Sequence, residues 1–112
     1  MGYTEKRRCE RMPFRTRLTV LDAVTKRACQ ANSIDLSISG AQFHAGRFLV
    51  VGTHIRIRFW LGQGGQSVPV ELGATVRWAR AEQEGAIMGV EFDGLLSPSY
   101  CPELYEQLFA RL

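Results

Sequence analysis

Hydrophobic and polar residues alternate along most of the chain from Arg15 onward, which is typical of half-buried β-strands. The clearest stretch covers residues 54–61, where every second side chain is apolar. Alternate side chains on a strand point to opposite faces. One face would carry Ile55, Ile57, Phe59 and Leu61, and the other Arg56, Arg58 and Trp60.

The same period predicts further strands along the chain. They cover the segment around Leu18 and Val20 and residues 27–34, 41–43, 68–80 and 86–92. In the long segment 68–80 the alternation places Leu72, Ala74, Val76 and Trp78 on one side. Polar or glycine-rich turns separate these strands at residues 22–26, 35–40, 62–66 and 82–85.

The C-terminal tail changes to a helical period. Its apolar residues recur three or four positions apart, at Leu104, Tyr105, Leu108, Phe109 and Leu112. Pro102 suits a first helical position, and Glu103 suits the positive end of the helix dipole. We therefore expect a helix over about residues 99–112 that closes a mainly antiparallel β domain. Six or seven short strands favour a small barrel, which also hides its sheet edges.

Composition agrees with one globular domain. The chain has 112 residues, of which 46% are hydrophobic, and a net charge of +3, which mildly favours anionic partners. No apolar run approaches the length of a membrane span, and no apolar signal-peptide core is present. Its three cysteines are odd in number and widely spaced, so the sequence predicts no disulfide framework. The expected location of the protein is therefore the reducing cytoplasm.

Positive charge gathers near the N-terminus. The first 17 residues hold six cations, Lys6, Arg7, Arg8, Arg11, Arg15 and Arg17. Charge alone would make this segment a solvated tail. However, Arg7, Arg8 and Arg11 place three guanidinium groups within five residues. Such forks match two phosphate oxygens, or O6 and N7 of guanine, and they also stack on a base.

A second short motif begins at Asp35 and continues through Ser37 and Gly40. The carboxylate can accept hydrogen bonds from N1–H and N2–H₂ of guanine, and the hydroxyl can both donate and accept. The glycine serves where the backbone turns or a base lies close. Alone, this pattern is typical of an ordinary Asx or Ser turn. Combined with the arginines, it indicates a guanine nucleotide as the ligand.

Both motifs together resemble the signature of PilZ domains, bacterial receptors for cyclic di-GMP. The resemblance extends to residues 75–78 and 88–92 and covers nearly the whole chain. It implies a six-stranded antiparallel split β-barrel with a C-terminal helix, formed by residues 15–112, behind a flexible arginine-rich arm over residues 1–14. It also implies a ligand site composed of Arg7, Arg8, Arg11, Asp35, Ser37, Gly40 and Trp78. A core position is an equal alternative for Trp78.

The resemblance further implies a cytoplasmic receptor that is not an enzyme and needs no cofactor besides its ligand. Ligand binding would order the arm and signal to an unidentified effector protein. Motility, exopolysaccharide production, biofilm formation and virulence are the pathways expected of relatives. A monomer or weak homodimer is expected, and the number of bound ligands stays open.

Two other functions are compatible with the sequence. One alternative is a PilZ-like adaptor that binds only protein. Another is a basic nucleic-acid-binding barrel that uses Arg56, Arg58 and Trp60. Cys9, His44 and His54 show no metal-ligand spacing, and no nucleophile–base arrangement favours catalysis.

Overall fold

A computed structural model describes residues 11–63 and 65–110. The described part contains seven strands and one helix. These are β1 (Met12–Pro13), β2 (Arg17–Asp22), β3 (Ala28–Leu36), β4 (Gly40–Ala45), β5 (His54–Gln63), β6 (Gln66–Ala81), β7 (Ala86–Phe92) and α2 (Pro102–Ala110).

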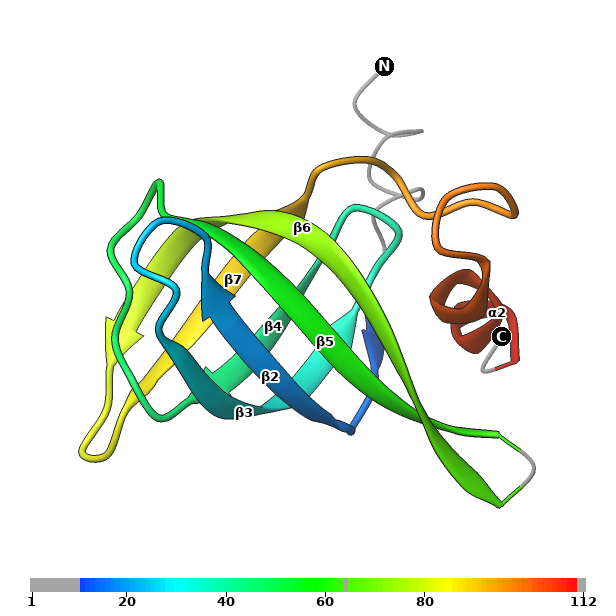
Figure 1. Cartoon of the computed structure of the whole chain (residues 1–112), viewed down its shortest axis with the longest axis horizontal. Helices are drawn as coiled ribbons and strands as arrows, with labels where there is room; N and C mark the ends of the chain where they lie inside the picture. Colours follow the sequence, from blue (N-terminus) through cyan, green and yellow to red (C-terminus); the bar gives the residue numbers. More distant parts are fainter. Residues whose placement is uncertain (1–10, 64, 111–112) are drawn as a thin grey trace.

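Six of these strands close into an antiparallel barrel. The order is β3-β2-β5-β6-β7-β4, and β4 pairs back onto β3 (Figure 1). The short β1 lies outside this ring and pairs with the last two residues of β3, so that Pro13 faces Asp35. Closure confirms the predicted six-stranded barrel.

The barrel interior is filled by the apolar face of each strand, as the alternation predicts. Side chains such as Leu18, Phe43 and Ile57 have no exposed surface. The rings of Phe14, Phe59 and Phe92 make tilted and edge-on contacts at centroid distances of 6.3 and 6.5 Å. Phe14 is buried and β1 pairs with β3, so the expected arm, residues 1–14, overlaps the packed barrel at its last residues.

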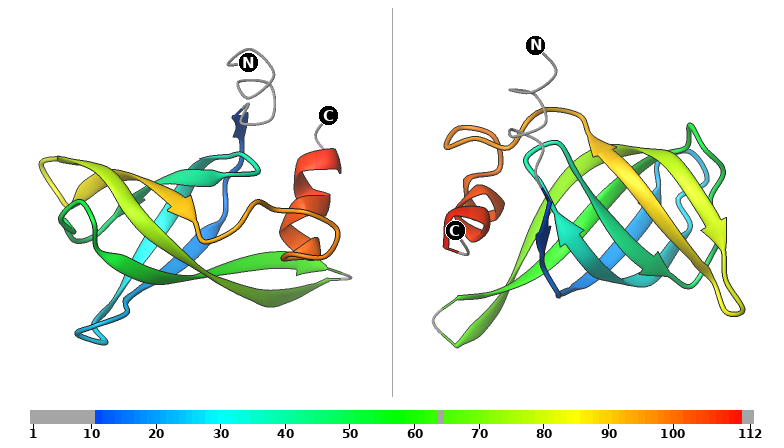
Figure 2. Two further views of the ribbon diagram at one scale, coloured as in Figure 1. Left: turned by 90° about the horizontal axis from the view of Figure 1, so that it is seen from above. Right: turned by 180° about the vertical axis from the view of Figure 1, so that it is seen from behind.

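The helix packs beside the end of the barrel where β1 lies (Figure 2). Leu104 and Leu108 are buried on its inner side. It begins at Pro102, later than the expected residue 99. The Ser97 hydroxyl accepts hydrogen bonds from the backbone N–H groups of Ser99 and Tyr100, at 3.2 and 2.9 Å, and closes a turn there instead.

Two irregularities in the strands change the expected faces. β3 continues through Leu36, so Asp35 lies on a strand and not in the turn, and the pairing of β3 with β4 shifts between Ser33 and Asp35. A similar shift in β6 lies between Val76 and Trp78. One extra residue in a strand moves every later side chain of that strand to the opposite face of the sheet. The predicted common face of Val76 and Trp78 is therefore wrong, because Trp78 is 37% exposed.

Candidate functional site

The two sequence motifs meet through one ion pair. Arg11 lies directly before β1, and β1 pairs with the end of β3 that carries Asp35. The Arg11 Nη1 donates a hydrogen bond to Asp35 Oδ1 at 3.0 Å, across 24 residues of sequence. Both side chains keep access to solvent, so a pair of this kind contributes only about 0–1 kcal/mol. A ligand can therefore compete for either partner at little cost.

A buried serine fixes the segment that follows Arg11. Ser33 Oγ donates to the carbonyl of Phe14 at 2.5 Å and accepts from the backbone N–H of Thr16 at 2.7 Å. Ser33 is 1% exposed, so losing these bonds would leave buried polar groups unpaired. Sequence reasoning missed this residue. Its only signal in the sequence is its position, because a serine stands where the alternation of the strand predicts an inward-facing apolar residue.

Ser37 belongs to the predicted motif, but its hydroxyl points into the protein. The side chain has no exposed surface, and its Oγ accepts hydrogen bonds from the backbone N–H groups of Ser39 and Gly40, both at 3.2 Å. The Ser37 N–H also donates to the Gly40 carbonyl at 2.9 Å. These bonds shape the β3–β4 turn that follows Asp35. Direct contact of Ser37 with a ligand stays a prediction, and the geometry favours an indirect role.

Gly40 is required by the approach of β4 to β7. A Cβ atom built on Gly40 would overlap the carbonyl oxygen of Val90 on the neighbouring strand. The structure thus gives this glycine a packing role within the barrel wall, beside any role toward a ligand.

Trp78 lies on the same outer wall as Asp35. Strand pairing connects Trp78 of β6 to Gly89 of β7, Gly89 to Gln42 of β4, and Gln42 to Asp35 of β3. Paired residues share a face, so this row spans three strand spacings, or about 14 Å. The indole covers Gly89, where a Cβ would overlap it. Gln42 and Gly89 are members of this wall that sequence reasoning missed, because only the strand register places them there.

A cavity of about 350 Å³ opens beside the ion pair. It is lined by Arg11, Met12, Pro13, Arg15, Ile34 and Asp35. Two guanidinium groups against one carboxylate give it a positive balance, which suits an anionic ligand that also offers hydrogen-bond donors to Asp35.

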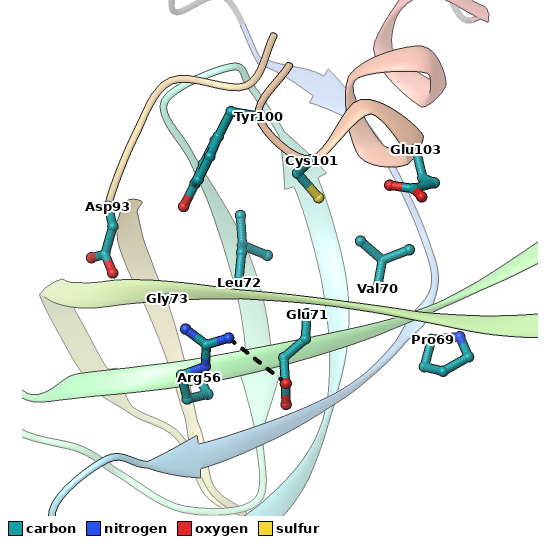
Figure 3. A pocket seen from close by; sticks show the side chains of 10 residues that line it. All are labelled: Arg56, Pro69, Val70, Glu71, Leu72, Gly73, Asp93, Tyr100, Cys101 and Glu103. Carbon is teal, nitrogen blue, oxygen red and sulfur yellow. Dashed lines mark ion pairs between the residues drawn. The ribbon is translucent and has the colours of Figure 1, made fainter. Parts of the chain in front are cut away.

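A second cavity, of about 370 Å³, separates β6 from the segment before α2 (Figure 3). Its charged side chains are Arg56, Glu71, Asp93 and Glu103, and Arg56 lies 3.7 Å from Glu71. Three carboxylates against one guanidinium make this cavity a poor site for an anion. Although slightly larger, it contains none of the predicted site residues.

The thiols of two cysteines in the described part of the chain have low reactivity. Burial raises the pKa of the Cys101 thiol, which lies in this second cavity, and burial likewise raises the pKa of Cys29, although Arg47 opposes that shift. Both thiols therefore stay protonated near neutral pH.

The other residues singled out in the sequence are two arginines, one cysteine and two histidines. Arg7, Arg8 and Cys9 lie outside the described residues. His44 and His54 are separate: His44 Nε2 lies 2.9 Å from the Glu84 carbonyl, and His54 Nδ1 lies 3.1 Å from Thr75 Oγ1. Within residues 11–63 and 65–110 no group of histidine, cysteine and acidic residues is arranged to hold a metal ion. The same part of the chain has no helix long and apolar enough to span a membrane.

Known structures contain the same fold. The PilZ domain of YcgR from Escherichia coli, solved with c-di-GMP, superposes with a TM-score of 0.73 at 15% identity, covering 95% of this chain and 91% of that one. The Bacillus subtilis inhibitor of motility MotI/DgrA gives 0.65 at 14% identity, over 91% of this chain. This chain spans only 50% of MotI/DgrA.

The PilZ domain of CeSA from a cellulose-synthesizing bacterium gives a TM-score of 0.60 at 20% identity, covering 90% of this chain and 96% of that one. No curated protein sequence matches this chain. The sequence profile of the PilZ domain, however, matches residues 5–109, which is nearly the full length. The chain therefore belongs to the PilZ domain family.

Proposed function

We propose that this protein is a receptor for cyclic di-GMP and that the ligand binds on the wall between Arg11 and Trp78. The observation that carries the proposal is the 3.0 Å contact of Arg11 with Asp35, one residue from each of the two sequence motifs. The similar fold of the YcgR domain, a structure that contains c-di-GMP, supports the same ligand class.

Each group on this wall matches part of a cyclic guanine dinucleotide. The Arg11 guanidinium would bind phosphate oxygens or the O6 and N7 edge of guanine, and Asp35 would accept from the guanine N–H groups. Trp78 offers an indole face at the other end of the row, where a base can stack. Arg7 and Arg8 would add further charged contacts, as the resemblance implies.

The energetics allow the exchange of partners. Opening the exposed Arg11–Asp35 pair costs about 0–1 kcal/mol, whereas each new hydrogen bond to a charged group returns roughly 1.5–3 kcal/mol. Two or three such contacts therefore exceed the cost of opening the pair and leave free energy for ordering the segment that carries Arg7 and Arg8.

Ser37 and Gly40 would act in this proposal by positioning. The Ser37 hydroxyl holds the turn after Asp35, and Gly40 lets β4 approach β7. Together they keep the carboxylate of Asp35 and the amide of Gln42 on one surface.

The signal would pass to another protein. We propose that the bound ligand, through Arg7 and Arg8, brings the residues before Arg11 against the wall and that an effector protein recognises the changed surface. The proposed function consists of ligand binding and a change of the protein surface, so it needs no catalytic step and no further cofactor.

A nucleic-acid-binding barrel is less well supported. In the stripe expected for it, Arg56, Arg58 and Trp60, each arginine already has a carboxylate partner. Both arginines pair with Glu71, at 3.7 and 3.4 Å, and Arg58 also lies 5.9 Å from the centre of the Trp60 ring.

Calorimetric titration of variants with cyclic di-GMP tests the proposed site. We expect Arg11→Ala and Asp35→Ala each to weaken binding about tenfold or more, because each removes a charge-assisted contact. Arg58→Ala is the matched control, since it also deletes an arginine paired with a carboxylate, but on the β5–β6 wall. Equal affinity of Asp35→Ala and the wild type would contradict the guanine-recognising role of Asp35.

A further inference from the structure

Exposed apolar side chains gather at one end of the barrel. Six large apolar residues are well exposed in the described chain, and four of them belong to two loops. These four are Val24 at 81%, Val50 at 64%, Val51 at 61% and Phe48 at 48%. A cluster of exposed apolar side chains marks a surface that binds a protein, a membrane or another apolar ligand.

The barrel topology brings the two loops together. β4 ends beside the start of β3, where Ala45 pairs with Ala31, and β5 starts beside the end of β2, where Ile55 pairs with Asp22. The connection over residues 46–53 must therefore cross the β2–β3 turn. Two hydrogen bonds tie the loops to the neighbouring strands, from Gly46 N–H to the carbonyl of Gln30 on β3 at 3.2 Å and from Ala23 N–H to the carbonyl of His54 on β5 at 2.9 Å. Figure 1 shows both loops at the end opposite α2.

The tip of the loop over residues 46–53 has a fixed shape. The Thr53 N–H and hydroxyl donate to the Val50 carbonyl at 3.1 and 2.6 Å, and Gly52 has a φ of 95°. This is the glycine position of a type II turn, which presents Val50 and Val51 at its corner. Leu49, 8% exposed, anchors the loop in the core. A preformed surface loses little conformational entropy when it docks.

The same loops carry an excess of positive charge. Lys26, Arg27 and Arg47 accompany the apolar tips, against one carboxylate, Asp22. Asp22 is engaged with backbone, because its Oδ1 accepts from Val24 N–H at 2.9 Å and Thr25 N–H at 3.1 Å.

The adjoining β6–β7 turn changes this balance only in part. It adds one ion pair, Arg80 with Glu82 at 3.0 Å, and the carboxylate of Glu84. Cations still outnumber carboxylates at this end of the barrel.

We propose that this end of the barrel docks on an anionic phospholipid bilayer. Val24, Phe48, Val50 and Val51 enter the boundary between headgroups and acyl chains, and Lys26, Arg27 and Arg47 contact lipid phosphates. Asp35 lies seven residues farther along β3 than Ala28, or about 23 Å from this surface. The wall that carries Asp35 therefore stays open to solvent while the loops are docked.

Co-sedimentation with vesicles of equal parts phosphatidylglycerol and phosphatidylcholine, at low salt, tests the proposal. We expect the wild-type protein to sediment with these vesicles and not with pure phosphatidylcholine. Replacing both valines, Val50→Ser with Val51→Ser, should lower partitioning roughly tenfold, because two apolar contacts are lost. Arg47→Ser should lower it about fivefold, the effect of one cation near an anionic surface.

Matched controls come from exposed residues elsewhere. Leu95→Ser removes an exposed apolar side chain, and Arg58→Ser removes an exposed cation, both outside the loops. Neither should change partitioning. Val24→Ser provides an independent variant in the other loop, and thermal unfolding verifies that each variant is folded.

Three results would overturn the proposal. The first is wild-type protein that stays in the supernatant with anionic vesicles. The second is equal sedimentation with anionic and neutral vesicles. The third is unchanged vesicle binding by the Val50 and Val51 double variant, including the case in which that variant instead disrupts self-association between copies of this chain.

Discussion

Ser37 and Gly40 flank the β3–β4 turn, and neither reaches the surface. Their roles are set by backbone groups: Ser37 Oγ accepts from two N–H groups, and Gly40 lies against the Val90 carbonyl. At the scale of single residues, the motif therefore combines one partly exposed carboxylate, Asp35, which we propose recognises the ligand, with two residues that shape its support.

Gly40→Ala should destabilise the fold by roughly 1–3 kcal/mol, because the added methyl overlaps a backbone oxygen that cannot move aside. Chemical denaturation measures this loss. Gly62→Ala is the matched control, since nothing lies within 4 Å of a Cβ at that strand position. Equal stability of the two variants would contradict the packing role of Gly40.

Asp22 should make part of the stability depend on pH. Hydrogen bonds from the backbone N–H groups of Thr25 and Val24 lower the pKa of this carboxyl below its usual 3.8. The folded pKa lies below the unfolded one, so this stabilisation is present above about pH 4 and is lost as pH falls through the folded pKa. Asp22→Asn should narrow the difference in thermal midpoint between pH 7 and pH 3, and an unchanged difference would exclude this role.

The binding chemistry of single residues could be predicted in part from the sequence. Residue type alone indicates that Arg11 and Asp35 suit a guanine nucleotide, and the structure does bring these two together. The inward direction of Ser37 was not predictable, because it depends on hydrogen bonds formed only once the turn is closed. Ser33 escaped notice because its partners, Phe14 and Thr16, lie 19 and 17 residues away in the sequence.

At the scale of strands, two bulges decide what the outer wall presents. The shift between Ser33 and Asp35 carries Asp35 onto the row of Gln42, and the shift between Val76 and Trp78 turns the indole outward over Gly89. Alternation predicted most strand faces, but it cannot locate an inserted residue. For that reason the strand positions were predicted well and the face of Trp78 was not.

Gly89→Ala should displace the Trp78 indole, because the new methyl would overlap the ring. In a Trp60→Phe background, which leaves Trp78 as the single tryptophan, we expect a red-shifted emission and weaker cyclic di-GMP binding. Gly46→Ala is the control, since its nearest neighbour to a Cβ is a carbonyl at 3.9 Å. Unchanged emission would show that Trp78 does not rest on Gly89.

At the scale of the whole molecule, barrel closure separates two surfaces. β1, which pairs with the end of β3 that carries Asp35, lies toward the α2 end, and the apolar loops lie at the other (Figure 1). Strand number, antiparallel pairing and the C-terminal helix followed from periodicity. The pairing of β2 with β5, of β4 with β7 and of β1 with β3 did not, because contacts distant in sequence leave no local pattern.

Calorimetric titration of the wild-type protein with cyclic di-GMP, alongside GTP and linear di-GMP, tests whether this chain is a cyclic di-GMP receptor. We expect saturable heat at micromolar cyclic di-GMP, a defined stoichiometry, and much weaker binding of both controls. No heat at micromolar cyclic di-GMP, or equal binding of GTP, would contradict the proposed function.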